Sequence, residues 1–167
     1  MERPTILHLS AVKRILRYLK GTLQFGLVYS EKGGNNIISG YSDSDMGGTV
    51  DDRKSTGGMA YYLNESLISW VSQKQRCVAL SSCEAELMAA IAAASQGIWS
   101  KHIDIRYHFI RECVERDEVI VKHVSSGMQQ ADSLTKAMTT IKFERTRDLL
   151  GVQQLDKKFE IKGRIVG

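Results

Sequence analysis

Three acidic residues stand where a site for metal-dependent phosphodiester chemistry would need ligands. Asp43 ends an apolar run over residues 37–41. Glu86 lies in the first turns of an Ala- and Leu-rich stretch, and Asp132 begins a short helical pattern late in the chain. Hydrolysis of a phosphodiester by two divalent cations, about 3.5–4 Å apart, needs several carboxylates that converge from separate elements. Spacing alone does not select these three from the 19 acidic residues of the chain.

Other acids near these three have structural explanations. Ser81 followed three residues later by Glu84 is a capping-box pattern, which gives Glu84 a role at the start of a helix. Asp45 and residues 51–52 lie in a Gly-containing segment typical of turns. An outer-shell contact to a metal is the functional alternative for Asp45. We therefore assign chemistry to Glu86 and not to Glu84.

Short strands and several helices are expected to position these residues. Strand patterns separated by Gly-, Asn- and Asp-rich breaks cover residues 26–29, 37–41, 59–63 and 67–71. Further along, the pattern predicts a helix over residues 81–96, an amphipathic helix over 102–117, a β-rich run over 119–124 and a shorter helix over 129–138. This order of elements predicts a mixed α/β or α+β domain.

A basic amphipathic helix is predicted near the N-terminus, with Ser10 as its cap and Gly21 at its end. Its apolar residues recur at helical spacing, and Lys and Arg occupy the other faces. This basic side is either a solvated charged face or a nucleic-acid contact. The basic clusters at residues 142–147 and 157–164 likewise suit either phosphate contact or solubility.

The composition is that of one globular domain: 167 residues, 43% hydrophobic and 25% charged. A formal charge of +4 permits a polyanionic partner. Three cysteines without a C-x-x-C pair indicate neither a disulfide framework nor a zinc site. No apolar run reaches the length of a membrane span, and the N-terminus lacks a signal-peptide core. We therefore expect an intracellular protein of the cytoplasm or nucleus, neither secreted nor membrane-bound.

A series of short motifs resembles the RNase H domain of copia-type retrotransposon Pol polyproteins. The motifs follow one another in the family's order and spacing: GYSDSD (40–45), DDRKSTG (51–57), ISW (68–70), KQ (74–75), ALSS (79–82), EAE (84–86), KHIDIRYHFIRE (101–112) and QADSLTK (130–136). Residues 3–22 resemble the end of the reverse transcriptase region of the same polyproteins. The likeness covers about residues 1–151. Met46 departs from it, because the family usually has Trp at that place.

The resemblance implies an RNase H-like mixed α/β sheet with flanking helices. The activity it implies is endonucleolytic hydrolysis of the RNA strand of RNA–DNA hybrids with Mg²⁺ or Mn²⁺. By motif, Asp43, Glu86 and Asp132 are the first, second and fourth of the four metal-binding, catalytic carboxylates. The implied partners are an RNA–DNA hybrid or another nucleic acid, and the reverse transcriptase region of the parent polyprotein. The implied divisions are a reverse transcriptase remnant (1–30), the RNase H-like domain (31–150) and a C-terminal tail (151–167).

The third carboxylate of the family has no counterpart in this chain. In the family it stands in a central strand between the long helix and the HIDI helix, where only residues 98–101 are found here. Four residues do not supply two turns and a strand of ~5–6 residues. The domain is therefore expected to be truncated between residues 97 and 102, without one metal ligand and one central strand. Asp104 does not replace the ligand, because its helical motif favours a solvated or capping role.

Two functions from different classes follow. The first is a ribonuclease on RNA–DNA hybrids whose turnover is impaired. The second is a catalytically inactive relict that binds nucleic acid or a protein partner through its basic helix and sheet surface. A third possibility is that the strand was excised from the gene model, so that the true product is a complete enzyme. The sheet edge left by the missing strand favours association, and the sequence leaves the oligomeric state open.

Overall fold

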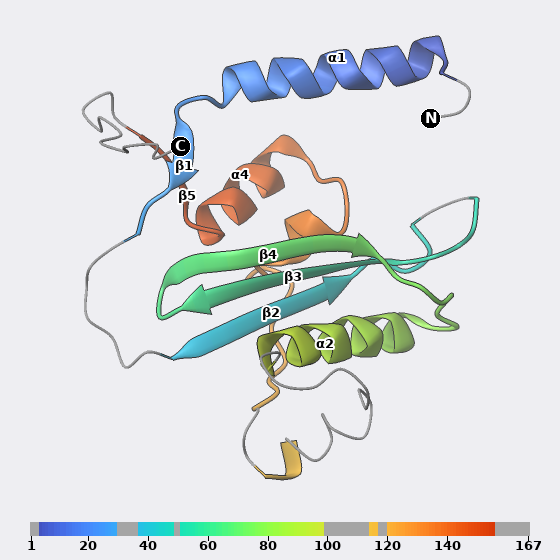
Figure 1. Cartoon of the computed structure of the whole chain (residues 1–167), viewed down its shortest axis with the longest axis vertical. Helices are drawn as coiled ribbons and strands as arrows, with labels where there is room; N and C mark the ends of the chain where they lie inside the picture. The colour runs from blue at the N-terminus through green and yellow to red at the C-terminus, as the bar shows by residue number, and fades with distance from the viewer. Residues whose placement is uncertain (1–3, 30–36, 49–50, 99–113, 117–119, 156–167) are drawn as a thin grey trace, which may run out of the picture. The chain divides into compact units, whose positions relative to one another are not determined.

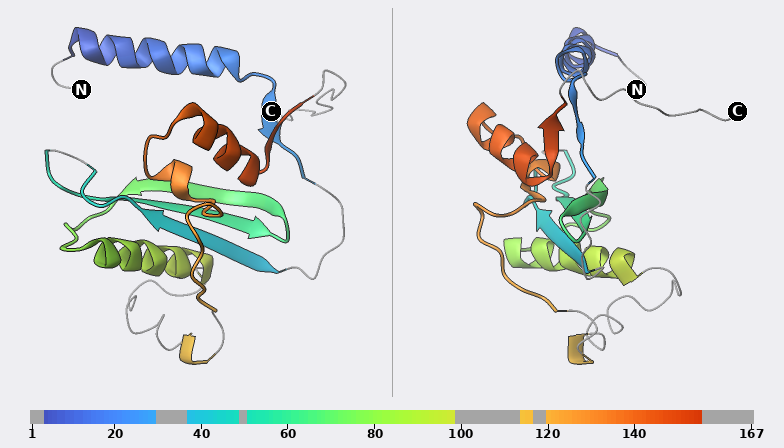
Figure 2. Two further views of the ribbon diagram at one scale, coloured as in Figure 1. Left: turned by 180° about the vertical axis from the view of Figure 1, so that it is seen from behind. Right: turned by 90° about the vertical axis from the view of Figure 1, so that its left-hand side faces the viewer.

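The computed structural model describes residues 4–29, 37–48, 51–98, 114–116 and 120–155. The chain divides into two compact units, one made of Met1–Val28 and Val152–Gly167 and the other of Tyr29–Gly151 (Figures 1 and 2). The predicted mixed α/β class is confirmed, and the arrangement is compatible with an RNase H-like fold. The predicted divisions at residues 30 and 150 stay predictions. No helix among the described residues is both long and apolar enough to cross a membrane.

The first unit consists of helix α1, Ile6–Gly21, and a two-stranded antiparallel ribbon. The expectation that Ser10 caps α1 is wrong, because the helix begins earlier. The Thr5 hydroxyl accepts a hydrogen bond from the His8 amide, and His8 Nδ1 accepts one from the Thr5 amide, so this reciprocal cap fixes the start. In the ribbon, β1, Phe25–Leu27, pairs with β5, Val152–Gln154.

The second unit is built on a three-stranded antiparallel sheet with the strand order β2-β3-β4. The strands are β2, Ile38–Ser44, β3, Thr56–Leu63, and β4, Ser66–Lys74, so the three predicted here are confirmed and extend further along the chain. Asn64 turns β3 into β4 in the left-handed region, with φ of 55°, a conformation that asparagine tolerates. The register places Asp43 of β2 directly opposite Gly58 of β3.

Alternation along β3 divides the sheet into two covered faces. Gly57 and Tyr61 face helix α2, Ser82–Ile98, which lies along one side of the sheet in Figures 1 and 2. Three buried alanines spaced four residues apart form the inner face of α2: Ala85, Ala89 and Ala93. The predicted start of α2 is confirmed, because the Ser81 hydroxyl accepts a hydrogen bond from the Glu84 amide at 3.2 Å.

The opposite face is covered by the 3₁₀ turn η1, Asp132–Leu134, and by helix α4, Thr140–Leu149. The face of β3 at Gly58 is turned toward η1, and the Tyr62 hydroxyl donates to the Leu149 carbonyl of α4. The helix predicted over residues 129–138 is wrong, since only this single 3₁₀ turn forms there. The Thr135 hydroxyl donates to the Asp132 carbonyl at 3.0 Å, and such local side-chain bonding competes with continuation as an α-helix.

The strand predicted over residues 119–124 is also not found, because described residues 120–124 form no strand. Ile120 and Val121 are largely exposed, so their strong β-propensity has no neighbouring strand to pair with among the described residues. The helix predicted over residues 102–117 lies almost entirely outside the described residues.

Tyr61 should measurably stabilise the packing of α2 on the sheet. Its buried hydroxyl donates to the Ala93 carbonyl at 2.7 Å, so we expect Tyr61→Phe to lower the free energy of unfolding by about 1 kcal/mol in urea titrations at neutral pH. Burial raises the pKa of Tyr61 from its ordinary value of 10.0 to about 12, which favours the protonated phenol in the folded state. The wild-type advantage in the free energy of unfolding should therefore shrink as the pH rises above 10, and it should reverse before pH 12 is reached.

The control is Tyr29→Phe, which removes an exposed hydroxyl and should change the free energy of unfolding by less than about 0.5 kcal/mol. An equal loss in both variants would contradict the role given to Tyr61.

Candidate carboxylate site

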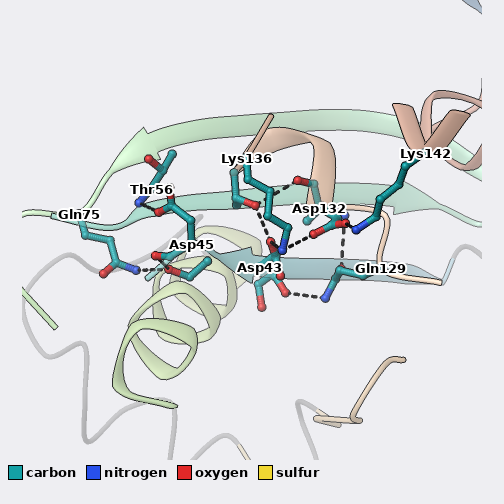
Figure 3. Close-up of polar contacts among 12 residues, drawn as sticks. Asp43, Asp45, Thr56, Gln75, Gln129, Asp132, Lys136 and Lys142 are labelled. Carbon is teal, nitrogen blue, oxygen red and sulfur yellow. Dashed lines mark hydrogen bonds and ion pairs between the residues drawn. The ribbon is translucent and has the colours of Figure 1, made fainter. Parts of the chain in front are cut away.

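The structure brings two of the three predicted carboxylates together. Asp43, near the end of β2, and Asp132, at the start of η1, lie on the same side of the sheet (Figure 3). Thr135 connects the two residues, because its hydroxyl proton is shared between Asp43 Oδ2, at 2.5 Å, and the main-chain carbonyl of Asp132, at 3.0 Å. Thr135 and Asp43 are 92 residues apart in sequence, so this contact is made by the tertiary fold.

A glycine in the central strand allows this approach. A Cβ atom on Gly58 would lie 2.8 Å from the Leu134 Cβ and 2.8 Å from the Thr135 Cγ2, both too close for carbon atoms. Gly58 is the register partner of Asp43, so η1 packs on the sheet directly beside that carboxylate. The absence of a side chain on Gly58 therefore allows η1, which carries Asp132, to pack on the sheet beside Asp43.

Two lysines pair with the carboxylates. Lys136 Nζ lies 2.5 Å from Asp132 Oδ1 and 3.7 Å from Asp43 Oδ2, and Lys142 Nζ lies 2.5 Å from Asp132 Oδ2. The Asp132 side chain is 4% exposed and that of Asp43 is 12% exposed, whereas each lysine side chain is almost half exposed. The site thus consists of two largely buried carboxylates beneath two ammonium groups that reach solvent.

The ion pairs determine the charge states. Burial by itself would raise the pKa of Asp132, but the hydrogen bonds and charges of Lys136 and Lys142 outweigh burial and lower it below its ordinary 3.8. Partial burial likewise opposes the charge of Lys136, yet Asp132 and Asp43 outweigh it and raise the lysine pKa. Asp132 is therefore a carboxylate and Lys136 an ammonium ion at neutral pH.

Glu86, the third predicted residue, is not joined to this pair. It lies exposed on α2 beside the buried Ala85, and α2 covers the face of the sheet opposite to η1. In the described part of the chain, no group of three His, Cys, Asp or Glu side chains is arranged to hold a metal ion. The described residues therefore do not fit a multi-carboxylate metal centre, and the assignment of Glu86 as a ligand stays a prediction.

Asp45 has a structural role in the neighbouring turn. Its carboxylate accepts a hydrogen bond from the Thr56 amide, which ties the end of β2 to the start of β3. Gln75 Nε2 donates to the Ser44 hydroxyl and to the Ala85 carbonyl, so it links β2 to the first turns of α2. The contact between Asp45 and Thr56, shown in Figure 3, agrees with the turn-forming interpretation of Asp45.

Sequence reasoning missed Thr135, Lys136 and Lys142 as members of the site. Lys136 stands four residues after Asp132, a spacing typical of local ion pairs, and this signal was available in the sequence. Lys142 belongs to the basic cluster that we assigned to phosphate contact or solubility, and only the fold shows its pairing with Asp132. Gln129 also contributes, since its side-chain amide donates to the Ser42 carbonyl of β2 at 3.0 Å.

Fold and site together define an α/β domain that gathers aspartates from a strand and a distant turn on one face of its sheet. The chain is 36% identical over 188 aligned positions to the retrovirus-related Pol polyprotein from transposon TNT 1-94 of Nicotiana tabacum, covering 91% of the chain. It is 35% identical over 192 positions to the corresponding polyprotein from transposon RE1 of Arabidopsis thaliana, covering 93% of the chain. Over about nine tenths of its length, the chain is therefore similar to one segment of retrovirus-related Pol polyproteins from transposons.

The matched segment is a small part of these relatives. The chain spans 14% of the tobacco polyprotein and 13% of the Arabidopsis one. A shorter relative, secreted RxLR effector protein 161 of Plasmopara viticola, is 45% identical over 96 residues, which cover 58% of the chain and 67% of that protein. No protein-family model and no solved structure matches the chain.

Because η1 approaches Gly58 closely, we expect alanine substitutions at the adjacent Gly57 and Gly58 to differ in their effect on the free energy of unfolding. Gly58→Ala should lower the free energy of unfolding by about 1–3 kcal/mol, because the new methyl group overlaps Leu134 and Thr135. Gly57→Ala is the matched control, since its Cβ would meet Ala89 at an ordinary 3.7 Å. Urea unfolding measures both, and equal effects of the two substitutions would show that η1 does not pack on β3 in this way.

Asp132 should contribute stability that depends on pH. We expect Asp132→Asn to lower the free energy of unfolding at neutral pH by about 2 kcal/mol, because two charge-assisted contacts are lost. Since folding lowers the Asp132 pKa, this contribution is complete above pH 3.8 and is lost as the pH falls below that value. The control Asp52→Asn breaks an exposed ion pair with Lys74 and should change stability little. A wild-type advantage that persists in full well below pH 3.8 would contradict the assignment.

Proposed function

We propose that this chain is an RNase H-like domain derived from a retrotransposon Pol polyprotein. Its ancestral activity would be metal-dependent endonucleolytic hydrolysis of RNA in RNA–DNA hybrids, with turnover impaired in this chain. The observation that carries the proposal is the convergence of Asp43 and Asp132 from β2 and η1, two elements distant in sequence. The relationship to Pol polyproteins over nine tenths of the chain supports the same origin.

The impairment follows from an incomplete set of ligands. The proposed Mg²⁺ or Mn²⁺ site would need Glu86 and a third aspartate beside Asp43 and Asp132, and only the latter two meet in the described residues. The alignment with the tobacco polyprotein runs over 188 positions although it covers only 91% of the 167-residue chain. That relative therefore carries residues without counterparts here, as the loss of an internal segment from this chain would require.

A second candidate function is binding of nucleic acid without hydrolysis. Lys136 and Lys142 remain almost half exposed while they pair with the aspartates, so each ammonium group keeps donors free to meet a phosphate. The formal charge of +4 favours the same class of partner. Binding of this kind would weaken steeply with salt concentration, because phosphate contacts release counterions. We also propose that the protein is intracellular and that it associates with the reverse transcriptase region of a parent polyprotein.

The decisive experiment is incubation of a labelled RNA–DNA hybrid with the folded 167-residue chain in Mg²⁺ or Mn²⁺. We expect no cleavage above that of the Asp43→Asn variant or of a chelated sample, together with salt-sensitive binding in a filter or anisotropy assay. Cleavage that disappears both in Asp43→Asn and after chelation would overturn the proposed impairment.

A gain-of-function arm tests the origin of the domain. Any residues of the tobacco polyprotein that align between the equivalents of Trp99 and Lys101 would be inserted after Trp99. Because Lys136 and Lys142 already pair with the aspartates, the chimaera also carries Lys136→Met and Lys142→Met. Metal-dependent cleavage by this chimaera, lost again in Asp132→Asn, is the expected result. A folded chimaera that binds hybrid but never cleaves it would count against an RNase H origin. Sequencing the transcript across residues 99–101 shows whether the natural product already contains the segment.

A further inference from the structure

The two lysines occupy the space where a cation would meet the aspartates. Each oxygen of the Asp132 carboxylate has its own ammonium group at 2.5 Å, Lys136 on Oδ1 and Lys142 on Oδ2. Lys136 Nζ also lies 3.7 Å from Asp43 Oδ2, on the side where the two carboxylates face one another (Figure 3). A divalent cation that bridged the pair would have to displace this ammonium group.

The charges in this cluster already balance. Two carboxylates carry two negative charges and two ammonium groups carry two positive ones, while the Thr135 hydroxyl satisfies Asp43 Oδ2 further. A buried carboxylate needs such compensation, because an unpaired charge is strongly disfavoured away from water. The cluster therefore has no uncompensated charge that would attract a divalent ion.

The lysines also join separate elements of the second unit. Lys136 follows η1, and Lys142 lies in the first turn of α4, while Asp43 belongs to β2. Through Asp132, the cluster ties α4 and η1 to the end of β2. A bridging metal would make a comparable cross-link, so the ammonium groups perform the same structural task.

We propose that Lys136 and Lys142 are resident counter-ions that replace a divalent cation at the Asp43–Asp132 pair. The second unit folds, and keeps η1 and α4 docked, without Mg²⁺ or Mn²⁺, and the wild-type pair does not bind these ions at millimolar concentration. This inference goes beyond the proposed function, because it concerns cation binding in the absence of any nucleic acid.

The test uses Mn²⁺ as the probe with the full 167-residue chain. Electron paramagnetic resonance of the free ion reports binding, and thermal unfolding with chelator or with Mn²⁺ reports linkage to folding. The wild type should bind no Mn²⁺ at this pair and should show the same unfolding midpoint in both conditions. The Lys136→Met/Lys142→Met double variant should gain Mn²⁺ affinity by about tenfold or more, because the positive charges that repel the ion are gone. Its unfolding midpoint should fall with chelator and recover with Mn²⁺.

Two controls locate the effect at the Asp43–Asp132 pair. Lys74→Met removes an equal charge from the exposed Asp52 pair and should leave Mn²⁺ binding unchanged. Asp132→Asn in the double variant should abolish the gained binding. If the double variant does not fold, the single variant Lys142→Met carries the same comparison. The inference is overturned if wild-type protein binds Mn²⁺ in a manner that depends on Asp132, or if a folded lysine variant binds Mn²⁺ no better than wild type. Because no step uses a hybrid, these results stand apart from the cleavage assay.

Discussion

Neutralisation of the Asp132 carboxylate is the constraint on which the described part of the second unit depends. The side chain is 4% exposed, so its charge must be met by partners within the protein. Lys136 and Lys142 form ion pairs with its two carboxylate oxygens, and the Thr135 hydroxyl donates a hydrogen bond to Asp43 on β2. One charged cluster thereby fixes a turn and a helix on the sheet, and it does so with side chains that also reach solvent.

The alternation of residues along β3 determines which elements can contribute side chains to that cluster. Gly58 opens one face for η1, whereas Gly57 and Tyr61 meet α2 on the other. Asp43 shares the face of Gly58, and Glu86 approaches on the helix of the opposite face. A complete site for phosphodiester hydrolysis would need a further element at the edge of β2. Such an element would bring together carboxylates from the two faces of the sheet. The loss of a central strand would remove such an element, which is why we connect the truncation with impaired turnover.

The sequence predicted local features well where the causes are local. The Ser81 cap of α2 and the strands around Asp43 were predicted because capping and alternation depend on neighbouring residues. The strand expected over residues 119–124 failed because β-propensity forms a ladder only with a partner. Thr5 rather than Ser10 caps α1, because the helix begins at Ile6 and Thr5 and His8 each accept a hydrogen bond from the other's amide. The pairing of Lys142 with Asp132 depends on tertiary structure, so no local pattern in the sequence could show it.

The measurement that tests the account most directly is the anomalous scattering of crystals of the 167-residue chain grown in Mn²⁺. The account predicts no manganese peak between Asp43 and Asp132, with Lys136 and Lys142 both within hydrogen-bonding distance of Asp132. A manganese peak bridging the two carboxylates, with the lysine side chains turned toward solvent, would contradict it and would restore a metal site to this domain.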